Sequence, residues 1–225
     1  MQLLQFSTSH YCRKARLALG YKGITYEVAN LTPGLHALRL KPLTGTTTVP
    51  VLFPNDPAYP LVISDSSNIL RFLEANFPTP PLLPSDETLQ AESWLLEDWL
   101  DESIGTATRF VYYDYRSGEG KAIDPSLFSQ VLIRVVRSQY QINPTTAQLA
   151  TARLTQALHT LSLRWQHRPY LVGDSFSVAD LTAAALLSPL ALIPSYQQTY
   201  PWLFERIRDI HDLCHEAYPP GLYPT

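Results

Sequence analysis

The sequence contains little cysteine and little charge, and each shortage excludes a class of protein. Two cysteines among 225 residues are too few for a disulfide-rich secreted scaffold or for a structural zinc site made of four cysteines. Charged residues make up only 16%, and the formal net charge of −3 gives no electrostatic reason for a nucleic acid or an anionic membrane to bind. We therefore expect no nucleic acid and no membrane as a partner.

Long apolar runs and metal-binding motifs are also missing. The longest apolar stretch, residues 183–193, is broken by Ser188 and Pro189 and falls short of the roughly 18 residues that a membrane-spanning helix needs. The chain does not open with a basic segment followed by an apolar run, so we expect no secretory signal. His211 and His215 would share one face of a helix, but no third ligand follows nearby, so we predict no metal. Together these features predict a soluble cytoplasmic protein with reduced thiols.

Residues 1–78 alternate short β-type runs with helical runs. Their order is strand, helix, strand, helix, strand, strand, helix, which predicts a small mixed sheet with helices on its faces. The last two strands are joined by a turn and predict a hairpin. The expected elements are the strands 2–6, 26–28, 46–53 and 61–63 and the helices 11–21, 35–40 and 68–76.

The rest of the chain is predicted to be helical. Residues 77–88 contain four prolines, which a helix cannot pass through, so we expect a proline-rich linker at 79–90. After it, apolar residues recur at helical spacing, which predicts an all-helical domain over 91–225. Its expected helices are 91–110, 125–140, 145–166, 177–187 and 200–215.

The segment Ser9-His10-Tyr11-Cys12 lies where the first strand turns into the first helix. A side chain there lies beside free backbone N–H groups and the positive end of the helix dipole, a setting that lowers the pKa of a nearby thiol. The simpler interpretation is that one of the hydroxyl residues at 7–9 only caps the helix. The sequence is compatible with both interpretations.

A proline interrupts the third β-type run at Val49-Pro50. Proline removes a donor from the hydrogen-bond ladder, so it is unusual in the middle of a strand. A cis peptide bond would turn the Val49 N–H and C=O away from the sheet, where they could pair with an extended, peptide-like ligand. The alternative is a proline on an edge strand.

Two further motifs open helices. At Asp65-Ser66, a hydroxyl and the helix N–H groups could hold a carboxylate while Asp65 holds an ammonium group, which would fit an α-amino acid head group. An ordinary capping cluster is the alternative there. Ser177 and Asp180 have the spacing of a capping box with aspartate in place of glutamate, and we assign this box a structural role worth about 0.5–2 kcal/mol.

In this order and on these two halves, the four motifs resemble those of the soluble glutathione transferases over nearly the whole chain. The segment Ser9–Cys12 is similar to the family's catalytic Ser or Cys motif, Val49-Pro50 to its cis-proline, Asp65-Ser66 to its Glu/Asp-Ser pair and Ser177–Asp180 to its helical-domain capping box. The resemblance implies a thioredoxin-like N-terminal domain (βαβ-αββα), an all-helical C-terminal domain and a homodimer. It also implies that glutathione binds to the first domain and a small electrophile between the domains.

Two features depart from the family pattern. His10 stands where the family has proline, and the loop at 41–48 is rich in threonine and longer than usual. No tyrosine ends the first strand, so we do not expect catalysis by a tyrosine at that position. The sequence therefore leaves the class within the family open.

The resemblance places the sulfur of glutathione beside Ser9, which would donate a hydrogen bond to the thiolate. Lowering a thiol pKa by two units takes about 2.7 kcal/mol, which one hydroxyl donor and a helix N-terminus can supply. Tyr11 is the alternative donor. Cys12 lies about one helical turn after Ser9, and without a first cysteine the motif cannot run a dithiol cycle, so we interpret Cys12 as a buried small residue. Glutathione is then a co-substrate, and no cofactor is expected.

The other site residues are weaker predictions from the same resemblance. His36 and Lys41 are candidates for binding the glycyl carboxylate of glutathione, and Arg16 for either an ion pair or a glutathione contact. Aromatic residues near 110–115 could line the electrophile site or simply pack in the core. The predicted glutathione-binding residues are Ser9, His36, Val49, Pro50, Asp65 and Ser66, and the predicted electrophile-site residues are Tyr11, Phe110 and Tyr113.

Three functions fit these residues. The first is an enzyme, a glutathione transferase that conjugates the thiolate to small hydrophobic electrophiles in detoxification. The second is a glutathione-dependent thiol reductase or peroxidase, for which Cys12 would matter. The third is a non-catalytic interaction module with the same fold. The complete set of glutathione-site residues argues against the third, and we predict the first.

Overall fold

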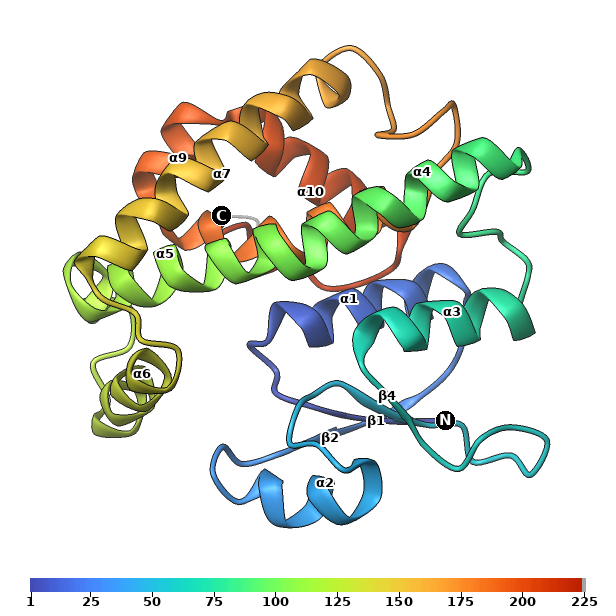
Figure 1. Cartoon of the computed structure of the whole chain (residues 1–225), viewed down its shortest axis with the longest axis horizontal. Helices are drawn as coiled ribbons and strands as arrows, with labels where there is room; N and C mark the ends of the chain where they lie inside the picture. Colours follow the sequence, from blue (N-terminus) through green and yellow to red (C-terminus); the bar gives the residue numbers. More distant parts are fainter. Residues whose placement is uncertain (224–225) are drawn as a thin grey trace.

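The computed structural model describes residues 1–223 as a sheet-containing first part followed by an all-helical second part (Figure 1). This confirms the α/β plus all-α organisation that the alternating and then purely helical sequence patterns predict. Within the described part of the chain, no helix has the length and apolar character that crossing a bilayer requires.

Four short strands form one sheet in the order β2-β1-β3-β4. The strands are β1 (Gln2–Gln5), β2 (Glu27–Asn30), β3 (Val51–Phe53) and β4 (Ile63–Ser64). β2 is parallel to β1, whereas β3 is antiparallel to both of its neighbours, β1 and β4. In this register Leu4 lies opposite Val51, which lies opposite Ser64. The C-terminal end of β1, the start of β3 and the C-terminal end of β4 therefore meet at the same end of the sheet.

Helices cover both faces of the sheet (Figure 1). α1 (His10–Tyr21) and α3 (Ser66–Asn76) pack together on one face, and α2 (His36–Thr44) lies on the other. Successive strand residues point to opposite faces, which explains this arrangement. Leu3 joins the large core shared with α1 and α3, whereas Leu4 packs in a smaller cluster toward α2.

The third strand is shorter than the sequence predicts. Of the expected run 46–53, only Val51–Phe53 pairs in the sheet, so the expected start of this strand was wrong. The physical reason is that Pro50 has no N–H to donate to a ladder, and the threonines before it are exposed. The Val49–Pro50 bond is cis, which confirms the prediction made for it.

α2 extends further than the sequence predicts and shortens the following loop. A helix was expected over 35–40, but α2 continues to Thr44 and ends at Gly45, whose φ of 74° is in the left-handed region that favours glycine. Residues 41–44, which the sequence analysis assigned to a long threonine-rich loop, are therefore helical. That expectation was wrong, and the loop before Val49 is correspondingly short.

A nearly continuous helical segment opens the second part of the molecule. α4 (Glu87–Asp98) begins four residues before the expected start at 91, because Asp86 caps it by accepting two backbone N–H groups at 2.9 and 3.0 Å. It continues through the π-helical turn η1 (Trp99–Gly105) into α5 (Thr106–Ser117). The single helix expected at 91–110 is therefore three segments, and the π-helical turn faces the start of α1 through contacts described below.

The remaining helices complete the bundle. α8 lies at its centre, in contact with α1, α4 and α10, and every residue of α8 is buried, as its nearly all-apolar sequence predicts. The short helices before α10 were not expected from the sequence. The bounds are η2 Glu119–Ile123, α6 Leu127–Gln139, α7 Pro144–Trp165, α8 Val178–Leu187, η3 Ser188–Leu192, α9 Pro194–Thr199 and α10 Pro201–Leu213.

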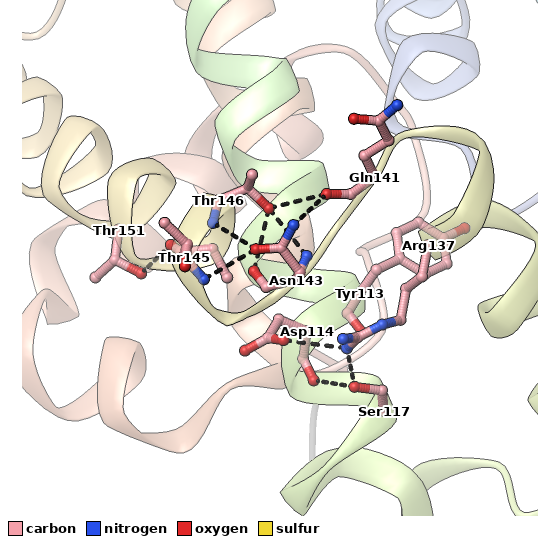
Figure 2. A network of polar contacts seen from close by, with 10 residues as sticks. Tyr113, Asp114, Ser117, Arg137, Gln141, Asn143, Thr145, Thr146 and Thr151 are labelled. Carbon is pink, nitrogen blue, oxygen red and sulfur yellow. Dashed lines mark hydrogen bonds and ion pairs between the residues drawn. The ribbon is translucent and has the colours of Figure 1, made fainter.

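α6 projects from the bundle and is tied to α5 near its C-terminal end (Figures 1 and 2). Arg137 donates hydrogen bonds to the Asp114 carboxylate at 3.0 Å and to the Ser117 hydroxyl. Just beyond α6, the side chain of Asn143 caps α7 by accepting two backbone N–H groups of its first turn at 3.0 and 3.1 Å. These contacts hold the short turn that carries Tyr140.

Candidate functional site

The register of the sheet brings the predicted glutathione-binding segments to one end of the first domain. Ser9 follows β1, Val49-Pro50 precedes β3, and Asp65-Ser66 follows β4, and these three strand ends are neighbours. Phe6, directly after β1, places its ring 4.9 Å from the ring of His36 at the start of α2. Segments that lie far apart in the sequence are therefore grouped at this end of the sheet.

Ser9 is the N-cap of α1. Its Oγ accepts a hydrogen bond from the Cys12 backbone N–H at 3.3 Å, so the capping interpretation is correct. A hydroxyl has one donor and two acceptor sites, so the cap uses an acceptor and leaves the proton available. Capping the helix and donating to a ligand are therefore compatible roles for the same hydroxyl.

Cys12 is fully buried below this cap. Burial raises the pKa of its thiol, and the Ser9 hydroxyl only partly opposes that effect. The second cysteine, Cys214, is also buried, and burial raises its pKa as well. Because the thiolate is the reactive form, neither thiol is suited to attack a disulfide. Cys12 is thus a buried small residue, as the sequence analysis interpreted it.

Tyr11 points toward the second domain. Its hydroxyl donates a hydrogen bond to the Asp101 carbonyl oxygen in η1 at 3.0 Å. Burial raises its pKa, and Arg109 partly opposes the shift. The single proton of the phenol is already engaged, so this arrangement favours Ser9 over Tyr11 as a donor to sulfur. Tyr11 instead links the first turn of α1 to the π-helical turn.

Asp65 and Ser66 stand at the start of α3, where the side chain of Asp65 is exposed and that of Ser66 is buried. Asp65 is exposed, and its Oδ1 accepts backbone N–H groups from Ser67 and Asn68 at 2.9 and 3.1 Å. It adopts a φ of 77°, which is uncommon for a residue other than glycine. Ser66 is 2% exposed. The capping interpretation is therefore correct here too, and the second carboxylate oxygen of Asp65 accepts no hydrogen bond from residues 1–223.

His36 and Val49 complete the predicted glutathione-binding set. The half-buried His36 accepts a hydrogen bond from the Gly34 N–H through Nδ1 at 3.0 Å, which leaves Nε2 for another partner. Val49 is half-buried outside the strand, and its N–H and C=O make no hydrogen bond to any residue in 1–223. Unpaired main-chain groups at a strand end can accept an extended peptide ligand. Arg16, by contrast, pairs with Glu216 at 2.6 Å and is structural.

A buried lysine below this site was missed by the sequence analysis. Lys14 on α1 is fully buried and forms ion pairs with Glu97 and Asp101. Its Nζ also donates to the Ser67 hydroxyl at 3.0 Å, and that hydroxyl donates to Glu97 at 2.7 Å. Burial raises the pKa of Asp101, while Lys14 opposes the shift. The one available signal was the spacing of Glu97 and Asp101, which puts two acids on one helix face. This network joins α1, the start of α3 and the helical domain.

The predicted electrophile-site residues do not all face the same way. Phe110 packs against the main core and is an ordinary core contact. Tyr113 is half-buried near Arg137 (Figure 2), and burial raises its pKa to about 12. Between Tyr11 and the end of α6 lies Arg109, which the sequence analysis did not single out.

The start of α8 is closed and structural, as predicted. Asp180 is fully buried and accepts hydrogen bonds from Trp165 Nε1, the Leu171 N–H and both the N–H and the hydroxyl of Ser177, at 2.7–3.0 Å. Burial raises its pKa, and these hydrogen bonds oppose the shift. No side chain of the first domain takes part in these four bonds.

Two cavities lie on the helical domain. One of about 240 Å³ is lined by residues of α5, η2 and α6, and one of about 570 Å³ by residues of α7, α9 and α10 and by the turns that follow α7 and α9. Neither is lined by a residue of the first domain. Across residues 1–223, no three His, Cys, Asp or Glu side chains cluster as a metal site would require.

The fold and the arranged strand ends define a thioredoxin-like domain joined to a helical domain. A family model for the N-terminal domain of glutathione S-transferases matches residues 3–81. A solved glutathione S-transferase from Rhodospirillum rubrum F11 superimposes with a TM-score of 0.73 at 22% identity, covering 99% of this chain and 90% of that one. The first domain therefore matches the N-terminal domain of the glutathione S-transferases, and the whole chain has the fold of a soluble glutathione transferase.

Two curated relatives of more than 30% identity match less than half of the chain. A stringent starvation protein A homologue from Pasteurella multocida is 33% identical over 104 residues, which cover 44% of this chain and 47% of the relative. Glutathione S-transferase 1 of Dianthus caryophyllus is 41% identical over 92 residues, which cover 38% of each protein. The matched segments thus span less than half of either relative.

Proposed function

We propose that the protein is a glutathione transferase that conjugates the glutathione thiolate to small electrophiles, and that it works as a detoxifying homodimer in the cytoplasm. The observation that carries this proposal is the register Leu4–Val51–Ser64. It brings the helix-capping hydroxyl of Ser9, the main-chain groups of Val49 and the carboxylate of Asp65, one oxygen of which accepts no hydrogen bond from residues 1–223, to one end of the sheet. These groups complement the thiol, the cysteinyl backbone and the γ-glutamyl head group of glutathione.

Ser9 activates the sulfur in this proposal. Its proton is available while its oxygen caps α1, and the backbone N–H groups of the helix start lie beside it. A hydrogen bond to a charged acceptor contributes about 1.5–3 kcal/mol and a helix N-terminus about 0.3–1 kcal/mol. Together they lower a thiol pKa by one to three units, enough to ionise glutathione near neutral pH.

Asp65 and Ser66 hold the γ-glutamyl head group. The free oxygen of Asp65 accepts its ammonium group, and the start of α3 accepts its carboxylate. Lys14 supports this start from below, because it binds the hydroxyl of Ser67. Val49 pairs through its main chain with the cysteinyl unit, and His36 reaches the glycyl carboxylate.

Retention on immobilised glutathione followed by a substrate panel tests the proposal. The panel contains 1-chloro-2,4-dinitrobenzene, phenethyl isothiocyanate and a mixed disulfide of glutathione. We expect retention, conjugation of the first two above the uncatalysed rate, and no reduction of the disulfide, because both thiols are buried. Disulfide reduction without conjugation would support the reductase alternative.

A second candidate function is a non-catalytic protein with the same fold. The similarity to a stringent starvation protein A homologue favours it, since that relative is not named as a transferase. In that case the protein would neither be retained on glutathione nor turn over any member of the panel. The same two measurements therefore separate the candidates.

A further inference from the structure

Arg109 on α5 has an unusual environment for a half-buried arginine. Its guanidinium carbon lies 5.2 Å from the ring centroid of Tyr11 and 4.5 Å from that of Tyr140, so it lies between the turn after β1 and the end of α6. It makes no hydrogen bond and no ion pair with any residue in 1–223. Aromatic faces stabilise the cation but leave its N–H donors unused.

Most of the other buried or half-buried arginines have hydrogen-bond partners; the half-buried Arg208, far from the Ser9 turn in sequence, is an exception among the described residues. Arg16 pairs with Glu216, Arg137 with Asp114, and Arg116 donates to two hydroxyl groups. Two carboxylates act on the neighbouring Tyr11, those of Asp101 and Glu102. Asp101 is already paired with Lys14, and Glu102 is exposed and forms no ion pair within the described chain. The five-donor fork of Arg109 is therefore available.

The surroundings of Arg109 contain further unpaired polar groups. His10, the first residue of α1, is 7% exposed, and its Nε2 has no hydrogen-bond partner among the described residues. Burial, Arg109 and Arg13 lower the pKa of His10, which keeps this side chain neutral at pH 7. Arg13 is buried as well, and its Nη1 donates to the Ser188 hydroxyl at 2.6 Å, with Nε unpartnered. Two cations and one neutral imidazole thus lie next to the Ser9 turn, and neither cation forms an ion pair with a carboxylate of residues 1–223.

We propose that Arg109 binds an anionic group of the electrophile, so that the preferred substrates are small electrophiles that carry a carboxylate. This inference rests on the proposed function, because it assumes that the sulfur lies beside Ser9. Arg109 stacks on Tyr11, two residues beyond Ser9, so a carboxylate on the guanidinium leaves the rest of a small molecule directed toward the sulfur. Planar bidentate binding of a carboxylate is the interaction for which arginine is best suited.

A matched pair of aryl chlorides tests this proposal. In 4-chloro-3-nitrobenzoate and 4-chloro-3-nitrobenzamide, the thiolate attacks the same ring carbon, a C–S bond forms, and chloride leaves with the C–Cl bonding electrons. The thiol proton goes to the solvent. After division by the uncatalysed rates, we expect kcat/KM to be at least about tenfold higher for the benzoate. Equal values for the two substrates would overturn the proposal while leaving the proposed function intact.

The variant Arg109→Gln isolates the arginine. It should lower kcat/KM for the benzoate by about ten- to a hundredfold, mainly through KM, and change the benzamide less than about twofold. Arg109→Lys keeps the charge but not the fork, and should fall between the two. Arg71→Gln is the matched control, because Arg71 also stacks on an aromatic ring, that of Trp94 at 3.9 Å, and should change neither substrate. Equal losses for both substrates in Arg109→Gln would show a merely structural role.

A binding measurement separates this inference from the proposed function. The finished S-aryl glutathione adducts of the two chlorides need no turnover, and calorimetry can compare their Kd values on the wild-type protein. We expect the carboxylate adduct to bind about tenfold or more tightly, and Arg109→Gln to remove the difference. Equal Kd values would refute the role of Arg109. Failure of both adducts and of glutathione itself to bind would refute the proposed function and this inference with it.

Discussion

Two of the aspartates at helix starts in this protein differ in how much of their hydrogen-bonding capacity is occupied. Asp180 at the start of α8 is fully buried and accepts four hydrogen bonds, including those from Trp165 and Leu171. Asp65 at the start of α3 is exposed, and only one of its oxygens accepts hydrogen bonds, from two N–H groups of its own helix. The aspartate at N3 of α8 is therefore closed, whereas the aspartate that is the N-cap of α3 is open.

The difference shows how a structural cap is distinguished from a binding cap. α8 is buried on all sides, so every polar group at its start must be satisfied from within the protein. α3 starts at an end of the sheet, where a carboxylate oxygen of Asp65 and the main chain of Val49 have no partner in the described part of the chain. Spare capacity at a fixed position, rather than the capping motif itself, is what marks a site for a ligand.

The largest expected effect is the loss of stability in Asp180→Ala. The substitution leaves buried donors of Trp165, Leu171 and Ser177 without a partner, and we expect the free energy of unfolding to fall by about 3–5 kcal/mol. This exceeds the 0.5–2 kcal/mol expected from the capping motif, because the sequence did not reveal the bonds from Trp165 and Leu171. Urea unfolding measures the change. A loss below about 1 kcal/mol, or lost turnover with unchanged unfolding, would contradict the closed and structural role.

A buried histidine extends the comparison to acid stability. His211 is fully buried, its Nδ1 lies 2.8 Å from the Ala217 carbonyl oxygen, and burial together with Arg13 lowers its pKa to about 4. Between its folded pKa and its unfolded pKa of about 6.5, this histidine binds a proton more readily in the unfolded chain. The folded state is therefore favoured above pH 6.5, and this contribution is lost as the pH falls toward 4. We expect about 3 kcal/mol to be lost in that window.

The control for this prediction is His211→Asn, whose side-chain N–H can still donate to Ala217 but does not titrate. The difference in unfolding free energy between wild type and variant, measured from pH 7 to pH 4, should shrink as the pH falls. A constant difference over that range would show that His211 does not titrate there and would refute the prediction.

The sequence predicted the buried start of α8 better than the strand ends where the glutathione site is proposed. Apolar periodicity identifies a buried helix such as α8 directly, and the cap spacing of Ser177 and Asp180 gives its start. The strand ends near Ser9, Val49 and Asp65 could be placed together only by the resemblance to a known family. No local pattern encodes the register that joins them.

The polar groups around the site were the least predictable. Lys14 and Arg109 lie in segments whose sequence is typical of ordinary amphipathic helices, and exposed positions are the usual interpretation of such charges. Their burial follows from the packing of α1 against the helical domain, which involves contacts between residues more than 80 positions apart. Those contacts depend on tertiary structure and leave no periodic signal.

Removing the carboxylate of Asp65 tests whether this exposed cap binds a ligand, in contrast to Asp180. Asp65→Ala should weaken glutathione binding by about 1.5–3 kcal/mol, the value of a hydrogen bond to a charged group, with little change in the KM of the electrophile. Asp86→Ala is a matched control, because Asp86 caps α4 with the same two-bond geometry and lies outside the site. Calorimetry of glutathione binding should show the loss in the first variant only. Similar losses in both would mean that Asp65 acts only as a cap.

The smallest of these effects is that of Ser9, which both caps and, in our proposal, binds the sulfur. Ser9→Ala should raise the pKa of bound glutathione by about one to two units, which corresponds to roughly 1.4–2.7 kcal/mol. Conjugation near neutral pH should fall about ten- to a hundredfold, with a smaller loss at alkaline pH, where the thiol ionises unaided.

The loss of the cap alone does not shift a pH profile. Ser126→Ala is the matched control, since Ser126 caps α6 through one N–H at 3.2 Å, and it should lower stability without moving the profile. A shifted profile in Tyr11→Phe but not in Ser9→Ala would make Tyr11 the donor, despite its bond to Asp101. If neither substitution shifts the profile, the backbone N–H groups of α1 stabilise the thiolate, and Ser9 belongs with Asp180 among the closed, structural caps.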